Sequence, residues 1–156
     1  MTSDAVHSSE THSIIVRNAQ LEDAPALCEL LAELGYSATT EQVQNRISGF
    51  ARSQRTAIFV AETAGRVVGA LSFHCIPLFH ADGSLGRITS LVVAPELRRH
   101  GVGRSLIAAA EFFASQHDCI RLEVTSGTHR PDAHTFYECL GYKAASRRFI
   151  KDTRSA

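Results

Sequence analysis

The chain has 156 residues, of which 44% are apolar and 21% are charged, and its 16 basic residues balance its 16 acidic ones. This length and composition are typical of one globular domain with a sizeable core. Because the net charge is zero and no apolar run approaches the roughly 18 residues of a membrane helix, we expect neither nucleic acid nor a membrane as a partner.

The start of the chain, Met1 to His12, is polar and lacks the apolar core of a signal peptide. We therefore expect a disordered tail over residues 1–12, a folded domain over residues 13–152 and a cytoplasmic protein. The cysteines form no C-x-x-C pair, so a metal site is not expected, and the thiols should be reduced. They are Cys28, Cys75, Cys119 and Cys139.

The first third of the chain predicts one strand and two helices. Residues 14–16 form a short β-branched run that predicts a strand. A helix should open at residues 22–23, with a proline in its first turn, and end at Gly35. A second amphipathic helix should follow, because Thr39 and Gln42 form a capping-box pattern in front of apolar residues at helical spacing.

The rest of the chain alternates strands and helices. Strands are predicted at residues 57–62 and 67–76, joined by a hairpin turn at Ala64-Gly65. A loop over residues 77–86, a strand over 87–93, a helix over 103–116, a strand over 119–125, a helix over 131–140 and a last strand containing Phe149-Ile150 follow. This order indicates an α/β fold in one domain. Its mixed sheet should carry helices on both faces and contain one right-handed parallel crossover.

The sharpest sequence feature is a basic, glycine-containing turn between the strand at 87–93 and the following helix. Gly101 and Gly103 would let a phosphate approach the backbone, unpaired helix amides would face it, and the flanking arginines would add positive charge. Taken alone, the pattern also fits a glycine turn with solvated arginines. The third glycine of a Rossmann fingerprint is replaced by Leu106, and the Gly-Lys-Ser/Thr of a P-loop is absent.

This turn resembles the R/Q-x-x-G-x-G/A signature of the GNAT superfamily of N-acetyltransferases, with Arg98, Gly101 and Gly103 at the motif positions. The resemblance covers about residues 14–150. It implies the GNAT fold and acetyl-CoA as cofactor, with the turn on the pyrophosphate and the splayed end of the preceding strand on the pantetheine arm. The implied cofactor-binding residues are Leu91, Val92, Val93, Arg98, Arg99, His100, Gly101, Val102, Gly103, Arg104 and Ser105.

A second segment resembles the superfamily's later motif, A-x-x-F-Y-E-x-x-G-F/Y. The matching residues are Ala133, Phe136, Tyr137, Glu138, Gly141 and Tyr142. The resemblance implies that Tyr137 protonates the departing thiolate, a reasonable task for a phenol. In the other interpretation Tyr137 packs beside Phe136 and only hydrogen-bonds the cofactor. The match is incomplete, because Arg130 stands where many members carry asparagine.

Acyl transfer to an amine requires the neutral amine, and many members place a carboxylate on the strand before the pyrophosphate turn to take its proton. Here that strand reads Arg87-Ile88-Thr89-Ser90-Leu91 and contains no carboxylate. Ser90 could orient a water molecule that accepts the proton, although a hydroxyl is no useful base itself. Nearby candidate bases are Glu123, His74, His80 and Asp82.

The resemblance implies an N-acetyltransferase that moves acetyl from acetyl-CoA to a primary amine by direct attack, most simply on a small molecule. Acceptor-site residues would come from residues 34–50 and the loop 77–86, whose mixture of apolar and acidic groups could hold a small cationic amine. Alternatives are a protein or peptide N-acetyltransferase, a non-catalytic module that senses acetyl-CoA, and a nucleotide-binding regulatory domain. Members of the superfamily often pair, so a homodimer is the expected assembly.

Overall fold

The structure of the protein is a computed structural model, and it describes residues 12–125, 131–145 and 147–154. The chain divides into two compact units, residues 1–125 and residues 126–156. Most of the tail expected at residues 1–12 lies outside the described residues. All strands of the described part and three of its α-helices belong to the first unit.

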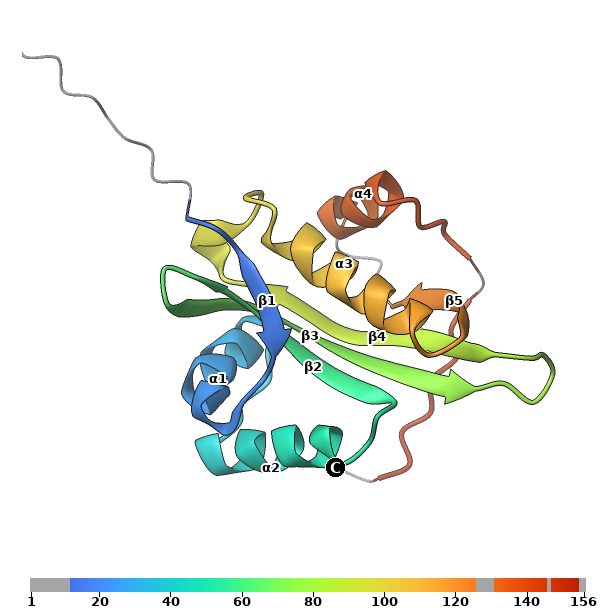
Figure 1. The fold of residues 1–156 in the computed structure, drawn as a ribbon, viewed down its shortest axis with the longest axis horizontal. Coiled ribbons are helices and arrows are strands. Elements are labelled where there is room, and N and C mark those ends of the chain that lie inside the picture. The colour runs from blue at the N-terminus through green and yellow to red at the C-terminus, as the bar shows by residue number, and fades with distance from the viewer. Residues whose placement is uncertain (1–11, 126–130, 146, 155–156) are drawn as a thin grey trace, which may run out of the picture. The chain divides into compact units, whose positions relative to one another are not determined.

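A five-stranded sheet in the order β1-β2-β3-β4-β5 forms the centre of the first unit. Neighbouring strands are antiparallel except β4 and β5, which are parallel and joined through a helix (Figure 1). This confirms the expected mixed sheet with one parallel crossover. The strands are β1 (Ile15–Asn18), β2 (Thr56–Thr63), β3 (Arg66–Pro77), β4 (Ser84–Val93) and β5 (Cys119–Val124).

Helices cover both faces of this sheet, as expected. The pair α1 (Ala24–Glu33) and α2 (Thr40–Ala51) lies on one side and α3 (Val102–Ser115) on the other (Figure 1). Short 3-10 turns, η1 (Leu21–Asp23) and η2 (Pro95–Leu97), precede α1 and α3. Alternation along the strands assigns successive side chains to opposite faces, so each strand contributes to two separate layers of packing.

The face covered by α3 is tightly packed around aromatic rings. Phe113 of α3 meets Phe59 and Phe73 of the sheet edge-on, each at 5.8 Å between ring centroids. At Gly69 of β3 the helix approaches so closely that a Cβ atom would lie 2.9 Å from Cγ1 of Val102. This face is the core that holds the sheet and α3 in register.

Local sequence signals correctly placed two boundaries. The turn between β2 and β3 has positive φ at Ala64 (50°) and Gly65 (72°), as a two-residue hairpin of the favoured twist requires. The capping box at the start of α2 is complete. The Gln42 amide donates to Oγ1 of Thr39 at 3.2 Å, and the Thr39 amide donates to Oε1 of Gln42 at 3.0 Å.

Two boundaries differ from the sequence-based expectation. β4 begins at Ser84 rather than at Arg87, because Gly86 pairs with Cys75 of β3 and the Phe73 ring lies over it, 2.6 Å from where a Cβ would stand. The loop before β4 is therefore shorter than expected. The last strand expected at Phe149-Ile150 is wrong, since these residues form no strand in the structure. A two-residue apolar run between charged neighbours has too few pairing groups to specify one.

Candidate active site

The turn after β4 is built from backbone conformations that only a few residue types adopt easily. Arg98 is extended (φ −64°, ψ 147°), whereas Arg99 (φ 66°) and Gly101 (φ 85°) are left-handed. Gly101 is also the residue that caps α3. A side chain at a φ of 85° would be strained, so glycine at position 101 meets a backbone requirement of the turn.

The N-terminus of α3 presents unpaired backbone amides toward this turn. The Ser105 amide donates to the carbonyl of Gly101 at 3.0 Å and closes the first helical turn. The amides of residues 102–104 precede it, so helix geometry leaves them without intrahelical acceptors, and no side chain caps the helix. Such a terminus attracts a phosphate through both its amides and its dipole.

The basic side chains of the turn are largely available to an anion. Within the described part of the chain Arg99 and Arg104 form no ion pair, and Arg98 lies only at 4.0 Å from Glu33. Nδ1 of His100 lies 2.8 Å from the Arg98 carbonyl and helps to fix the turn. The turn therefore fits a pyrophosphate, although the individual contacts of the predicted cofactor residues stay predictions.

The strand that enters this turn changes its pairing halfway along. β4 pairs with β5 from Ser84 to Ile88, and the last partner of β5 is Val124. Pairing with β3 continues to Val93. We call residues 84–88 the closed half of β4 and residues 90–93 the open half, since one edge of the open half has no strand partner among the described residues. The open half contains Leu91, Val92 and Val93, for which the resemblance implies contact with the pantetheine arm, and this role stays a prediction.

A β-bulge separates the two halves. The register with β3 passes from Ser72–Ser90 to Phe73–Ile88, so Thr89 is an extra residue in β4. The hydroxyl of Ser72 lies within hydrogen-bond distance of the hydroxyls of Thr89 (2.7 Å) and Ser90 (2.5 Å). We call these three residues the hydroxyl cluster. It places Ser90 at the start of the open half, and its role in orienting a water molecule stays a prediction.

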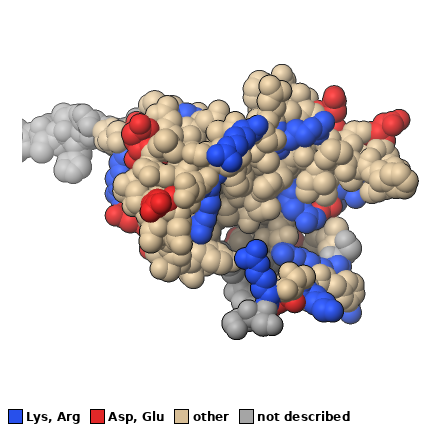
Figure 2. All heavy atoms as spheres, turned by 90° about the horizontal axis from the view of Figure 1, so that it is seen from below, with Lys and Arg blue, Asp and Glu red and all other residues tan. Residues whose placement is uncertain are grey.

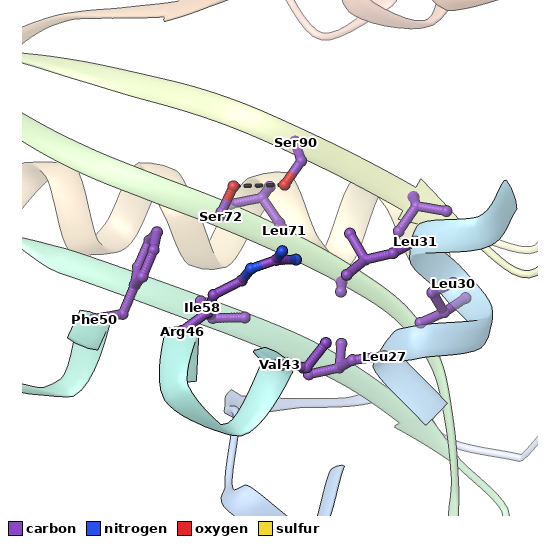
Figure 3. Close-up of a pocket in the computed structure, with 12 residues that line it drawn as sticks. Leu27, Leu30, Leu31, Val43, Arg46, Phe50, Ile58, Leu71, Ser72 and Ser90 are labelled. Carbon is purple, nitrogen blue, oxygen red and sulfur yellow. Dashed lines mark hydrogen bonds between the residues drawn. The ribbon is translucent and has the colours of Figure 1, made fainter. Parts of the chain in front are cut away.

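A pocket of about 180 Å³ lies between the sheet and the helices α1 and α2 (Figure 3). Apolar side chains form most of its wall, and Ser72, Ser90 and Arg46 are its polar members. Arg46 extends from α2 with its guanidinium directed into the pocket (Figure 3). The complete lining is Leu27, Leu30, Leu31, Val43, Arg46, Phe50, Ile58, Ala70, Leu71, Ser72, Ser90 and Val92.

This pocket agrees with only part of the expected acceptor site. Three lining residues fall in the predicted range 34–50, but none comes from the loop 77–86. That loop joins β3 to the start of β4, whereas the open half is at the other end of the strand (Figure 1). Ser90 lies six residue steps after Ser84 along β4, about 20 Å at 3.3 Å per step. His80 and Asp82 are therefore far from the hydroxyl cluster.

The remaining candidate bases lie on the same sheet but in different environments. Glu123 pairs with Arg87, with Nη2 and Oε2 2.8 Å apart, so its carboxylate already has a partner. His74 follows Ser72 by two positions and packs edge-on against Phe50 at 5.0 Å between ring centroids. Burial lowers the pKa of His74 and keeps its ring neutral near pH 7. None of these candidate bases is therefore a carboxylate that lines the pocket.

Tyr137 belongs to the second unit, on α4 (Pro131–Cys139). Its ring lies 5.2 Å from Phe136 and 5.9 Å from Tyr142, and the Tyr142 amide donates to the Tyr137 carbonyl at 3.0 Å. Gly141 (φ 89°) allows the chain to turn back after the helix. These contacts order the motif internally, and the proposed acid role of Tyr137 stays a prediction. Arg130 lies outside the described residues.

Two polar residues of the pocket, Arg46 and Ser72, were not singled out in the sequence, although Arg46 lies within the predicted range 34–50. Arg46 has the spacing of a residue at the border of the apolar face of α2, one turn before Phe50, and Ser72 is a lone hydroxyl in an apolar strand. Neither residue belongs to a recognisable sequence motif. Figure 2, seen from the side on which α1 and α2 lie in Figure 1, shows basic side chains separated by uncharged surface. A locally placed arginine is therefore more informative here than the overall charge.

Comparison with known proteins gives consistent results. A model of the Acetyltransferase (GNAT) family matches residues 24–142. The aminoalkylphosphonate N-acetyltransferase of Salmonella typhimurium is 35% identical over 144 residues, which cover 87% of this chain and 89% of that protein. The glucosamine 6-phosphate N-acetyltransferase of Trypanosoma brucei brucei is 31% identical over 98 residues, covering 62% of this chain and 65% of that protein.

Solved structures show the same fold. An aminoglycoside N-acetyltransferase in complex with CoA superposes with a TM-score of 0.81 at 15% identity, covering 94% of this chain and 99% of that one. Among the described helices, none combines the length and the apolar character needed to cross a bilayer.

Proposed function

The chain belongs to the Acetyltransferase (GNAT) family and is an acetyltransferase, and we propose that it transfers acetyl from acetyl-CoA to the primary amine of a small molecule. The single observation that carries this proposal is the open half of β4. It lies between a turn suited to a pyrophosphate and a pocket whose wall it shares through Ser90 and Val92.

The residues present suit the cofactor that the family uses. The amides at the start of α3, with Arg99 and Arg104, would hold the pyrophosphate, and left-handed Gly101 keeps side-chain atoms away from it. The edge of residues 90–93 that has no strand partner among the described residues would hydrogen-bond the amide groups of the pantetheine arm, much as a neighbouring strand would. When bound there, acetyl-CoA supplies an activated acetyl thioester.

The protein's own groups would then position an amine and manage two protons. The amine nitrogen forms the new bond to the acetyl carbon while the carbon–sulfur bond breaks. The hydroxyl cluster would orient a water molecule that takes the amine proton, and Tyr137 would protonate the thiolate. The apolar wall of the pocket disfavours a charge beside it and so favours the neutral form of the amine, which is the nucleophile.

The size of the pocket supports a small acceptor over a peptide. A volume of about 180 Å³ accommodates few heavy atoms, whereas a peptide chain needs an extended groove. The two relatives named above act on an aminoalkylphosphonate and on glucosamine 6-phosphate, both small amines by name. We take small amines as the first acceptor class on these grounds.

The proposal is tested by measuring release of free thiol from acetyl-CoA with a panel of small amines, a lysine-containing peptide and a peptide with a free N-terminus. We expect turnover with at least one small amine and none above background with the peptides. Turnover confined to the peptides would overturn the small-molecule assignment. Binding of acetyl-CoA without turnover of any acceptor would favour a sensing module.

A further inference from the structure

Arg46 is the charged side chain among the residues that line the pocket. It stands on α2 one turn before Phe50, and its guanidinium reaches toward the space between Leu31 and the Ser72–Ser90 pair (Figure 3). Leu71 and Ile58 form the adjoining wall. The guanidinium is therefore placed where an acceptor would contact it, and the open half of β4 borders the same space.

The arginine has no partner in the described part of the chain. Four other arginines of the first unit, Arg17, Arg66, Arg87 and Arg98, each lie 2.7–4.0 Å from a carboxylate, whereas Arg99 and Arg104 of the turn form no ion pair with a described residue. Arg46 forms neither an ion pair nor a hydrogen bond with any described residue. Because the residue is exposed to solvent, its charge is hydrated in the free protein and is available to a ligand.

We propose that Arg46 binds an anionic group on the acceptor, so that the substrate is a short aminoalkyl compound bearing a phosphonate, phosphate, sulfonate or carboxylate. This inference rests on the proposed function. A guanidinium holds such oxyanions through two parallel hydrogen bonds. With the anion on Arg46, the amine end of a short chain points toward Ser72 and Ser90, beside the open half of β4.

The same arrangement selects against other amines. No carboxylate lines the pocket, so a second ammonium group would lie beside Arg46 without a counter-ion. A neutral alkyl amine would contact the apolar wall of the pocket but would leave the Arg46 guanidinium without a partner. The anion of the substrate would by itself favour the protonated form of the amine. Its pairing with Arg46 offsets that effect.

The experiment compares acceptors of similar length and two variants of α2. The anionic probes are aminoethylphosphonate, aminoethanesulfonate and β-alanine; propylamine and diaminopropane are the neutral and cationic ones. Arg46→Gln removes the proposed anchor. Arg52→Gln, at the C-terminal cap of the same helix and outside the pocket, is the matched control. Both KM and kcat are measured for each acceptor, together with KM for acetyl-CoA.

For the wild type we expect kcat/KM at least about tenfold higher for the best anionic probe than for propylamine, and higher still relative to diaminopropane. Arg46→Gln should raise KM for that probe by about 10- to 100-fold, the loss expected for a charge-assisted hydrogen bond. Its KM for propylamine and for acetyl-CoA should stay within about threefold of wild type, below the loss of such a bond. Arg46→Lys should restore part of the affinity, because the charge returns without the planar fork.

Equal kcat/KM for anionic and neutral probes, or equal effects of the Arg46 and Arg52 variants, would overturn the inference while leaving the proposed function intact. If no amine is acetylated, the proposed function fails, and calorimetric titration of the acetyl-CoA-loaded protein with aminoethylphosphonate still decides the inference. Binding that is lost in Arg46→Gln and retained in Arg52→Gln supports it. Binding unaffected by either change contradicts it.

Discussion

The two halves of β4 show how one strand can serve as structure at one end and as a binding site at the other. In the closed half, neighbours pair on both edges, Gly86 lies under the Phe73 ring, and Ile88 is 1% exposed. In the open half, β5 has ended, and one edge has no strand partner among the described residues. The bulge at Thr89 marks the boundary and gathers the hydroxyl cluster.

This difference shows that the candidate site arises where the neighbouring strand β5 ends and β4 continues. An unpaired strand edge inside a folded domain is a template for any ligand with an amide backbone or equivalent groups. The closed half holds the open half in position, so the site needs no extra rigidity of its own. Substitutions in the closed half should therefore lower the stability of the fold. Substitutions in the open half, or in the turn that follows it, should weaken binding of acetyl-CoA.

The largest expected effect lies outside β4 and separates binding from chemistry. Tyr137→Phe should lower kcat by about 10²- to 10⁴-fold, the usual loss of a general acid. Thermal stabilisation by acetyl-CoA should stay as in wild type, because the phenyl ring keeps its packing against Phe136. Steady-state turnover and thermal unfolding measure the two quantities. Turnover within about threefold of wild type, too little for loss of an acid, would leave Tyr137 a structural residue.

The next effect tests the turn that follows the open half. Acetyl-CoA at 100 times its Kd should stabilise the wild type by about 2.7 kcal/mol, because it binds the native state alone. Gly103→Val should abolish that stabilisation, since the added side chain blocks approach of the pyrophosphate to the backbone. Thermal unfolding with and without acetyl-CoA measures both.

Gly49→Val is the control for the turn. Gly49 also lies inside a helix, and a Cβ there would meet no atom within 4 Å. This variant should keep the full response to acetyl-CoA. An unchanged response in Gly103→Val would mean that the pyrophosphate binds elsewhere.

A smaller effect, on folding, is expected in the closed half. Gly86→Val places a side chain where a Cβ would already lie 2.6 Å from Cζ of Phe73 and 3.3 Å from Cγ of Leu122. Overpacking of this kind costs about 1–3 kcal/mol of unfolding free energy. Urea unfolding should show that loss, and a combined Phe73→Leu change should recover part of it. The folded fraction should bind acetyl-CoA with wild-type Kd; a large rise in Kd would contradict the division into halves.

The smallest effects are expected at the candidate bases. Without a dedicated base, log(kcat/KM) should rise with pH at a slope near one, following the neutral fraction of an amine with a pKa near 10, about one molecule in 10³ at pH 7. Burial lowers the pKa of His74, so its own titration would appear only below about 6.5. A break above that value would point to a different group.

Single changes to alanine at His74, His80 and Glu123 should each lower kcat/KM less than about tenfold, short of a general-base loss. Glu123→Ala also frees Arg87, so Arg87→Ala is its control for loss of the ion pair alone. A drop of about a hundredfold at one position, with acetyl-CoA binding retained, would identify that residue as the base.

The parts of the fold that the sequence predicted depend on contacts between near neighbours in the chain. The capping box of Thr39 and Gln42 and the turn at Ala64-Gly65 are specified within four residues. The turn at residues 98–103 is likewise specified locally, because its glycine and arginine residues are neighbours in the chain. These signals sufficed to place the mixed sheet, its helices and the acetyltransferase family.

The parts that could not be predicted depend on distant residues. The start of β4 at Ser84 follows from the Phe73 ring over Gly86, a contact between strands that local propensity does not contain. The pocket brings Arg46 of α2 to Ser72 of β3 through packing of helix on sheet. The loop before β4 looked suited to an acceptor, and only the course of the strands shows that it faces the opposite end (Figure 1).

The most direct test of the account is hydrogen exchange along β4 with and without acetyl-CoA. We predict that acetyl-CoA slows exchange in peptides covering residues 90–105, where strand-edge and helix-terminal amides gain acceptors. Exchange in residues 84–88 should change little, because those amides lie between two paired strands in both states. Protection confined to residues 84–88, or spread evenly along β4, would contradict a cofactor site at the open half.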